Sequence, residues 1–561
     1  MAAAPQRRIP AAPPALPLAM LYPVFFAAVY LSHLTLLRLP YFWDEAGYYI
    51  PAAWDFYRTG TLIPVSTMTN AHPPLPSVLL AGWWRLWGFV PIATRTLVCM
   101  VSAAALLAVY RMARGLVGTR AAAAVAVLTG LYPVWFAQST LAHADIFAAA
   151  FTLWGLAFYV EGTDSPAAIH KGPGNQENSA IAAKKRTRLA VLAAAMFSLA
   201  ALSKETAVIT PLALAAWEGA LWVRERRSAA EETVAAIPGM RRVRLKWVAA
   251  LAFPALPLAA WYAYHFHHTG FIFGNPDFLR YNATDNLNPQ RIGLCLYHRL
   301  LHLTMHMNLF VPVTCAVAAW LSPAIVQRSR LPRAVMEGIG VVLLANWIAF
   351  SILGGALLTR YLLPMYPLVL LVCVAEWRLH FRAWIWLAAF TAAAFLAGLW
   401  INPPYSFAPE DNLTYRDFIV LHQQAVAMIA RQWPQATVLT AWPATSELSR
   451  PELGYTKKLV KVYSVRDFTL DEMEKAAQDP GDYDTALVFS TKWVPARSLL
   501  HPGAHRPSAV DMRYFDFHQD MQPAAAAALL HGDIVWQAHR NGEWIAVLRF
   551  PRVVDAKLDL R

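Results

Sequence analysis

Long apolar runs constrain this chain more than any other feature of its sequence. Runs of roughly 17–25 residues, each long enough to cross a bilayer as a helix, recur through the first 400 of the 561 residues. Charged residues make up only 15% of the chain, against about 25% in soluble proteins. The sequence therefore predicts a mainly α-helical, polytopic membrane protein.

The apolar runs predict eleven membrane spans. They lie near residues 17–37, 92–110, 121–138, 142–160, 188–203, 205–223, 247–267, 300–323, 335–357, 359–376 and 383–401. The segment 73–88 is shorter, contains Arg85 and opens with Pro73-Pro74. We predict that it forms a re-entrant or interfacial helix on the outer face.

Lysine and arginine are distributed unevenly between alternate loops. About 22 fall on one side of the predicted membrane and about 9 on the other, and by the positive-inside rule the richer side is cytoplasmic. The net charge of +13 is thus explained by topology and does not indicate nucleic acid. Residues 1–16 and the first span are expected to form a retained signal anchor.

This topology places many polar residues at the outer face. They are Asp44, Glu45, His72, Asp145, Lys204, Glu205, the cluster at 265–268, Arg280, Arg360 and Tyr361. Polar groups from several predicted helices converge on one side of the membrane, as expected of a site at the outer leaflet.

The chain changes character after residue 401. Strand-like runs occur at 437–442, 459–464 and 485–490, helical patterns at 446–454, 471–478 and 524–530, and two further runs flank Asn541-Gly542, a strong hairpin signal. We predict a transmembrane domain over residues 1–401 and an extracytoplasmic α/β domain over residues 402–561.

Several common site motifs are absent from the sequence. It has no Walker loop, no dinucleotide-binding glycine pattern and no HExxH, and its four cysteines form no CxxC pair. A transferase that faces outward without a nucleotide site needs a donor that is already outside. A lipid phosphate carrying a sugar fits that requirement.

Asp44-Glu45 is the leading pair of candidate catalytic residues. Carboxylates at membrane depth are costly and usually functional, and a positioned carboxylate can take the proton of an attacking hydroxyl or amine. The pair could also bind a metal ion, or be a solvated loop that pairs with Arg38 or Arg58. His72, before Pro73-Pro74, could contact a phosphate or a metal ion.

Each remaining candidate has a structural alternative. Asp145 at a span end needs a function or an ion pair, and Lys204 could bind phosphate or neutralise Glu205 in a hairpin. Arg360 could bind phosphate or snorkel at a helix end. Three histidines lie on one predicted helical face: His298, His302 and His306. They could form a metal site, but one helix rarely supplies a full set of metal ligands.

Taken in order, these motifs resemble the GT-C membrane glycosyltransferases, and among them family 39, which includes protein O-mannosyltransferases and aminoarabinose transferases. The similar blocks are Asp44-Glu45, His72-Pro73-Pro74-Leu75, residues 138–145, Ser203-Lys204-Glu205 and residues 360–364. The resemblance implies a polyprenyl-phosphate-sugar donor and transfer with inversion. It implies Asp44 as base, Glu45 and Asp145 in support of the acceptor or a divalent metal ion, and a phosphate site built from His72, Lys204, Arg280, Arg360 and Tyr361.

The sequence departs from the aminoarabinose transferases at three positions. Ala71 and His72 stand where those enzymes typically have glutamate and lysine, and Asp277 stands three residues before Arg280 in place of a histidine. The metal ion, the sugar and the acceptor, whether protein, lipid or cell-surface glycan, therefore stay open.

The leading hypothesis is a glycosyltransferase of the inner membrane whose active site is extracytoplasmic. The alternatives are a transporter or flippase of a lipid-linked substrate, and a membrane-anchored scaffold. Transporters favour polar residues near the midplane and often have internal repeats. Here the polar residues gather at one face, and no repeat is evident in the sequence.

Overall fold

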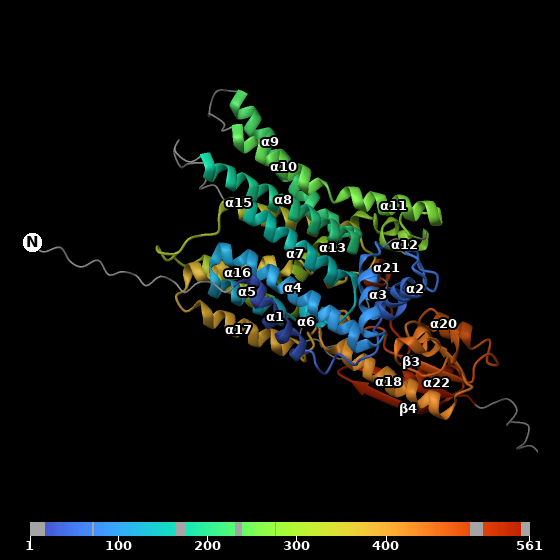
Figure 1. Cartoon of the computed structure of the whole chain (residues 1–561). Coiled ribbons are helices and arrows are strands. Elements are labelled where there is room, and N and C mark those ends of the chain that lie inside the picture. Colours follow the sequence, from blue (N-terminus) through green and yellow to red (C-terminus); the bar gives the residue numbers. More distant parts are fainter. Residues whose placement is uncertain are drawn as a thin grey trace, which may run out of the picture.

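The computed structural model describes residues 17–69, 72–163, 176–230, 238–274, 276–493, 509–515 and 517–550. A bundle of helices fills the first part of the chain, and a small sheet with its own helices lies at one end of the bundle (Figure 1). The helices before the sheet are α1 (Leu18–Ser32), α2 (Ile50–Thr59), α3 (Leu75–Trp87), α4 (Pro91–Val117), α5 (Thr119–Leu131), α6 (Pro133–Gln138), α7 (Ala144–Thr163), α8 (Gln176–Ser203), α9 (Ile209–Ala230), α10 (Pro238–Ala252), α11 (Ala255–Thr269), α12 (Pro276–Asn282), α13 (Pro289–Thr304), α14 (Phe310–Trp320), α15 (Arg333–Ile352), α16 (Tyr366–His380) and α17 (Trp384–Gly398).

The predicted spans all coincide with helices of the bundle, and the mainly helical membrane fold is confirmed. By length and hydropathy, six helices of the described chain can cross a membrane, and α13 with α14 makes a seventh if that bent pair is one span. Helices α1, α5 and α17 are apolar but shorter. The segment 73–88 forms α3, which packs against α2.

The span predicted at 300–323 is not one straight helix. Helices α13 and α14 meet at an angle of 99°. Met307 and Asn308 adopt positive φ angles of 45° and 67° between them, and left-handed residues interrupt the ladder of backbone hydrogen bonds that keeps a helix straight.

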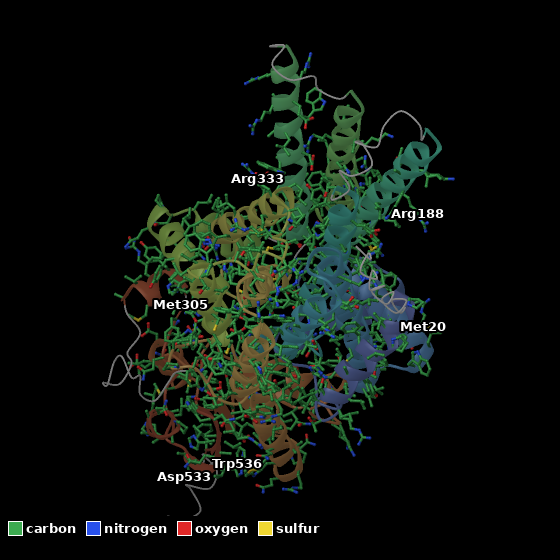
Figure 2. All side chains as sticks on the ribbon, turned by 90° about the vertical axis from the view of Figure 1, so that its left-hand side faces the viewer. Met20, Arg188, Met305, Arg333, Asp533 and Trp536 are labelled. Carbon is green, nitrogen blue, oxygen red and sulfur yellow. The ribbon has the colours of Figure 1, made fainter. Side chains whose placement is uncertain are left out.

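Two arginines mark the end of the bundle that is remote from the sheet. Arg188 and Arg333 lie toward one end of the molecule, and Asp533 and Trp536 lie at the other (Figure 2). The sequence assigns both arginines to the cytoplasmic side. We refer to the opposite end, where α2, α3 and the sheet lie, as the sheet-side end.

The sheet has five strands in the order β2-β1-β3-β5-β4. They are β1 (Thr437–Thr440), β2 (Lys461–Ser464), β3 (Thr485–Phe489), β4 (Asp533–Arg540) and β5 (Glu543–Arg549), accompanied by α18 (Thr414–Gln432), α19 (Ala444–Ser449), α20 (Leu470–Ala476), α21 (Ala509–Phe515) and α22 (Pro523–Leu529). Strand β1 runs parallel to β2 and β3, and β5 is antiparallel to β3 and β4. Asn541 and Gly542 have φ angles of 45° and 89° and form the predicted hairpin turn.

The sheet and the bundle share one hydrophobic core. Buried residues of β3 and β5 belong to the same cluster as those of α4 and α7. Tyr455 donates a hydrogen bond to the Tyr41 carbonyl over 3.0 Å, and Arg450 donates one to the Ser66 carbonyl at 2.5 Å. The sheet is thus fixed to the loops that follow α1 and α2, while the division of the chain into domains at residue 401 remains a prediction.

Candidate functional site

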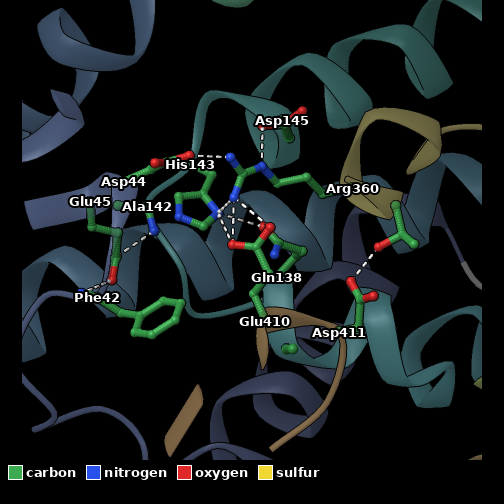
Figure 3. Close-up of polar contacts among 12 residues, drawn as sticks. Phe42, Asp44, Glu45, Gln138, Ala142, His143, Asp145, Arg360, Glu410 and Asp411 are labelled. Carbon is green, nitrogen blue, oxygen red and sulfur yellow. Dashed lines mark hydrogen bonds and ion pairs between the residues drawn. The ribbon is translucent and has the colours of Figure 1, made fainter. Parts of the chain in front are cut away.

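The candidate site is a cluster of charged side chains at the sheet-side end of the bundle. Asp44 immediately precedes the short helix η1 (Glu45–Tyr49), and Asp145 lies in the first turn of α7. Arg360 lies in η6 (Thr359–Leu362), just before α16, and Lys204 lies just after α8. Segments far apart in the sequence therefore place these side chains together. Figure 3 shows Asp44, Asp145 and Arg360.

Arg360 is the centre of the cluster. Its side chain is buried, and its guanidinium forms ion pairs with Asp44, with Asp145 at 3.4 Å and with Glu410 at 2.5 Å. The Nδ1 atom of His143 lies 3.4 Å from the guanidinium. Since a buried guanidinium needs compensating charge, these carboxylates fix the position of Arg360.

A second cation lies beside Asp145. Lys204 Nζ donates to Asp145 Oδ1 over 2.6 Å and lies 4.0 Å from the ring centroid of Tyr361. Two cations thus face three carboxylates when all are ionised.

Glu45 faces away from this cluster. Figure 3 shows its carboxylate turned toward Phe42 and Ala142, whose backbone N–H groups donate to it over 2.9 and 2.7 Å. Arg95 forms a fully buried ion pair with it at 3.3 Å. Arg95 also donates to the Thr140 carbonyl over 2.6 Å. The geometry thus makes Glu45 an anchor for the loop that carries Asp44.

His72 lies in the wall of an adjoining cleft. Its Nδ1 lies 2.7 Å from Glu205 Oε2, and its ring stacks against Tyr49 at 6.2 Å between centroids. The lining of this cleft includes Tyr48, Tyr49, Thr69, His72, Ala144 and Trp261. His72 therefore lies in a cleft that adjoins the charged cluster.

Arg280 lies outside the cluster. It is exposed on α12 and forms ion pairs with Asp277 at 3.4 Å and Asp285 at 3.7 Å. In the part of the chain that the structure describes, it pairs with no carboxylate of the cluster. The structure brings together Asp44, Asp145, Lys204, Arg360 and Tyr361, but not Arg280.

Sequence reasoning missed Glu410 and Asp411. They lie in η7 (Pro409–Asp411), between α17 and α18, and both are buried. They are two adjacent carboxylates that follow an apolar span, the same pattern that singled out Asp44 and Glu45. This pattern is visible in the sequence, but it lies after residue 401, in the segment predicted to form the α/β domain.

The residues do not form a metal site of the usual kind. Throughout the described ranges, no group of three or more His, Cys, Asp or Glu side chains is arranged to hold a metal ion. His306, one of the three histidines on the predicted helical face, has a carboxylate partner instead, since it pairs with Asp411 at 2.9 Å.

The Asp44 loop is also held by the sheet region. Trp442 lies against Trp43, with 4.9 Å between ring centroids, and a Cβ atom at Gly47 would lie 2.9 Å from Trp442 Cζ2. Only glycine permits this approach without a shift of the indole ring. The position of Asp44 thus depends on residues beyond the bundle.

We expect Gly47→Ala to lower kcat about tenfold, because a small displacement of a reacting group is costly. Adding Trp442→Leu should restore part of the loss, and this interaction is measured by a double-mutant cycle. Gly219→Ala is the control, since no atom lies within 4 Å of the added methyl group there. Full activity of Gly47→Ala would contradict the proposed close packing.

Comparisons with known proteins agree with this architecture. The family described as dolichyl-phosphate-mannose-protein mannosyltransferase matches residues 71–168. Two crystal structures of ArnT from Cupriavidus metallidurans are similar to the whole chain. The apo structure gives a TM-score of 0.56 at 14% identity, covering 94% of this chain and 98% of ArnT. The structure bound to undecaprenyl phosphate gives 0.54 at 12% identity, covering 94% and 97%.

A comparison with curated protein sequences gives no match. The fold of this chain is thus that of the ArnT structures. Residues 71–168 are in addition similar to the mannosyltransferase family.

Proposed function

We propose that this protein is an integral-membrane glycosyltransferase. It transfers a sugar, with inversion, from a polyprenyl-phosphate donor to a protein, lipid or cell-surface glycan at the outer face of the inner membrane. The observation that carries the proposal is the convergence of a partly exposed carboxylate and two cations at the sheet-side end of a GT-C fold. The undecaprenyl phosphate bound by ArnT supports the class of donor.

Asp44 is the proposed catalytic base. Its side chain is 20% exposed, whereas those of Asp145 and Glu410 are 3% and 4% exposed. An acceptor can therefore approach Asp44 more readily than the other two. The carboxylate of Asp44 takes the proton of the acceptor hydroxyl or amine as that group attacks the anomeric carbon.

Arg360 and Lys204 are proposed to bind the phosphate of the donor. As the acceptor bond to the anomeric carbon forms, the bond from that carbon to the phosphate oxygen breaks, and negative charge develops on the leaving phosphate. Fixed cations stabilise such charge, and Tyr361 orients Lys204 through its ring. A single displacement inverts the anomeric centre.

The other predicted residues take smaller parts in this proposal. His72 borders the cleft and is proposed to contact the donor there. Asp145 positions Lys204 and Arg360. Glu45 supports the Asp44 loop, and Arg280 is left out of the phosphate site because it is exposed and paired elsewhere.

The orientation rests on the distribution of charge. Arg188 and Arg333, which border basic loops in the sequence, lie toward the end remote from the sheet (Figure 2), and the positive-inside rule assigns basic loops to the cytoplasm. This assignment supports an extracytoplasmic site.

The direct test is sugar transfer in reconstituted membranes from a panel of labelled polyprenyl-phosphate sugars to extracted glycan, lipid and protein acceptors. We expect turnover with at least one donor. Lipid flipping without transfer from any donor would refute the enzyme and favour the flippase.

A further inference from the structure

Glu410 is a buried carboxylate that the proposed reaction does not use. It lies in η7, between the last apolar helix of the bundle and the first helix of the sheet region. Its carboxylate accepts from Arg360 Nη1 over 2.6 Å and lies 4.0 Å from His143 Nδ1. It thus occupies one edge of the guanidinium that is proposed to bind the donor.

We propose that Glu410 is a positioning residue: its ionised carboxylate holds the Arg360 guanidinium, and its protonation from solvent releases the guanidinium to the donor phosphate. This inference rests on the proposed function, because it requires a donor that carries a phosphate. It adds proton uptake as a condition of donor binding.

Carboxylates surround the Arg360 guanidinium. Its five N–H donors lie in a fixed plane, and each of its three nitrogens has a carboxylate within ion-pair distance: Asp44 at Nη2, Asp145 at Nε and Glu410 at Nη1. A phosphate that binds both Nη atoms of this buried guanidinium therefore displaces a carboxylate. Asp145 is already held by Lys204, and Asp44 is the proposed base, so Glu410 is the partner that can be released without disturbing either.

The balance of charge in the cluster also favours protonation of Glu410. With Asp44, Asp145 and Glu410 ionised, three negative charges face the two positive charges of Arg360 and Lys204. An incoming phosphate adds further negative charge in a buried place, where repulsion is strong. Protonation of Glu410 removes one charge, weakens its hold on Arg360 and leaves the remaining carboxylates balanced by the two cations.

The surroundings of Glu410 favour its protonation near neutral pH. Burial raises its pKa to about 8, and Arg360 opposes that rise, whereas Asp44, Asp411 and Asp145 add to it. His143 Nδ1 faces Glu410 at 4.0 Å. Helix α6, which packs against η7, has no ionisable side chain, and in the first turn of α18 Arg416 pairs with Asp417 at 2.8 Å.

The sign of the pH dependence follows from this arrangement. Below pH 8 Glu410 is mostly protonated and Arg360 is available. Above pH 8 ionised Glu410 competes with the phosphate, so affinity falls as pH rises. Because the second pKa of a phosphate monoester is about 6, most of the ligand is already doubly ionised at pH 7, and its charge changes little between pH 7 and pH 9.

The test measures binding of undecaprenyl phosphate to the full-length protein in detergent, by calorimetry between pH 6.5 and pH 9. For the parent we expect the Kd to rise about tenfold between pH 7 and pH 9. Glu410→Gln keeps the shape and an acceptor for Arg360 but cannot ionise, so its Kd should stay near the parent's pH 7 value. The KM for the donor should likewise rise with pH in the parent and stay constant in Glu410→Gln. The kcat of the variant should differ from that of the parent by less than about threefold.

Glu543→Gln is the matched control. Burial also raises the pKa of Glu543, to about 7, but this carboxylate lies in β5 and accepts from Ser490. Its variant should keep the parent's pH dependence. A second measurement needs no variant: titrations in buffers of different ionisation enthalpy should show uptake of about half a proton per ligand at pH 8.

The results distinguish the role of Glu410 from the proposed class of donor. If the parent binds undecaprenyl phosphate with no pH dependence and no proton uptake, or if Glu410→Gln retains the parent's pH dependence, the role of Glu410 is refuted and the donor class stands. If the parent binds no undecaprenyl phosphate at any pH, the donor class and the role of Glu410 are both refuted.

Discussion

Replacing Asp44 by asparagine is expected to lower kcat by about 10²–10⁴-fold, the range that a positioned general base contributes. The amide keeps the size of the side chain and can still accept a hydrogen bond from Arg360, but it cannot take a proton from the acceptor. Donor binding should persist, because Arg360 and Lys204 are unchanged. The measurement is single-turnover transfer from the donor identified in the panel, with undecaprenyl phosphate binding measured in parallel.

Asp484→Asn is the matched control for this substitution. Asp484 is 23% exposed and pairs with Arg549 at 2.9 Å, so it resembles Asp44 in burial and in having an arginine partner, but it lies beside the sheet. Its variant should transfer sugar at the parental rate. Parental turnover by Asp44→Asn would assign the base to another group, whereas loss of binding together with turnover would indicate a structural role.

Sequence periodicity was sufficient for the larger features of the fold. Apolar runs locate helices because each spanning segment must satisfy its own backbone in lipid, and Asn541-Gly542 located the hairpin because both residues tolerate positive φ. The bend between α13 and α14 was not predictable in this way. It arises where Met307 and Asn308 adopt left-handed backbone, within a run that remains apolar in sequence.

The charged cluster was only partly predictable. Depth in the membrane singles out ionisable residues, because each needs a partner or a function, and this argument found Asp145, Lys204 and Arg360. It could not separate Asp44 from Glu45. The two residues are adjacent in sequence, but the turn into η1 directs one carboxylate to Arg360 and the other to Arg95.

Long-range pairing accounts for the remaining differences. Glu410 lies 50 residues from Arg360 and is brought to it by the path of the chain after α17. Arg280 was placed in the phosphate site by similarity alone, and its exposure depends on how α12 lies on the surface. The adjacent carboxylates at 410 and 411 are visible in the sequence, but the pairing of Glu410 with Arg360 and the exposure of Arg280 are not.

Glu45→Ala is expected to lower the free energy of unfolding by about 3–5 kcal/mol, because removing one partner of a buried ion pair leaves the other charge uncompensated. Arg95 would remain buried, and the N–H groups of Phe42 and Ala142 would lose their acceptor. The measurement is equilibrium unfolding in mixed micelles. Glu161→Ala is the control, since Glu161 and Arg111 are 35% and 24% exposed and such pairs contribute less than about 1 kcal/mol.

Activity in the same variants decides what Glu45 does. As an anchor, Glu45 acts only through the position of Asp44. The activity of Glu45→Ala should therefore be proportional to the fraction of folded protein, and cooling should restore both. Glu45→Gln retains an acceptor for the two N–H groups and should lie between the parent and Glu45→Ala in both stability and turnover. A Glu45→Gln protein as stable as the parent but inactive would instead place Glu45 in the reaction, and would require the loop to open so that this carboxylate reaches the substrate.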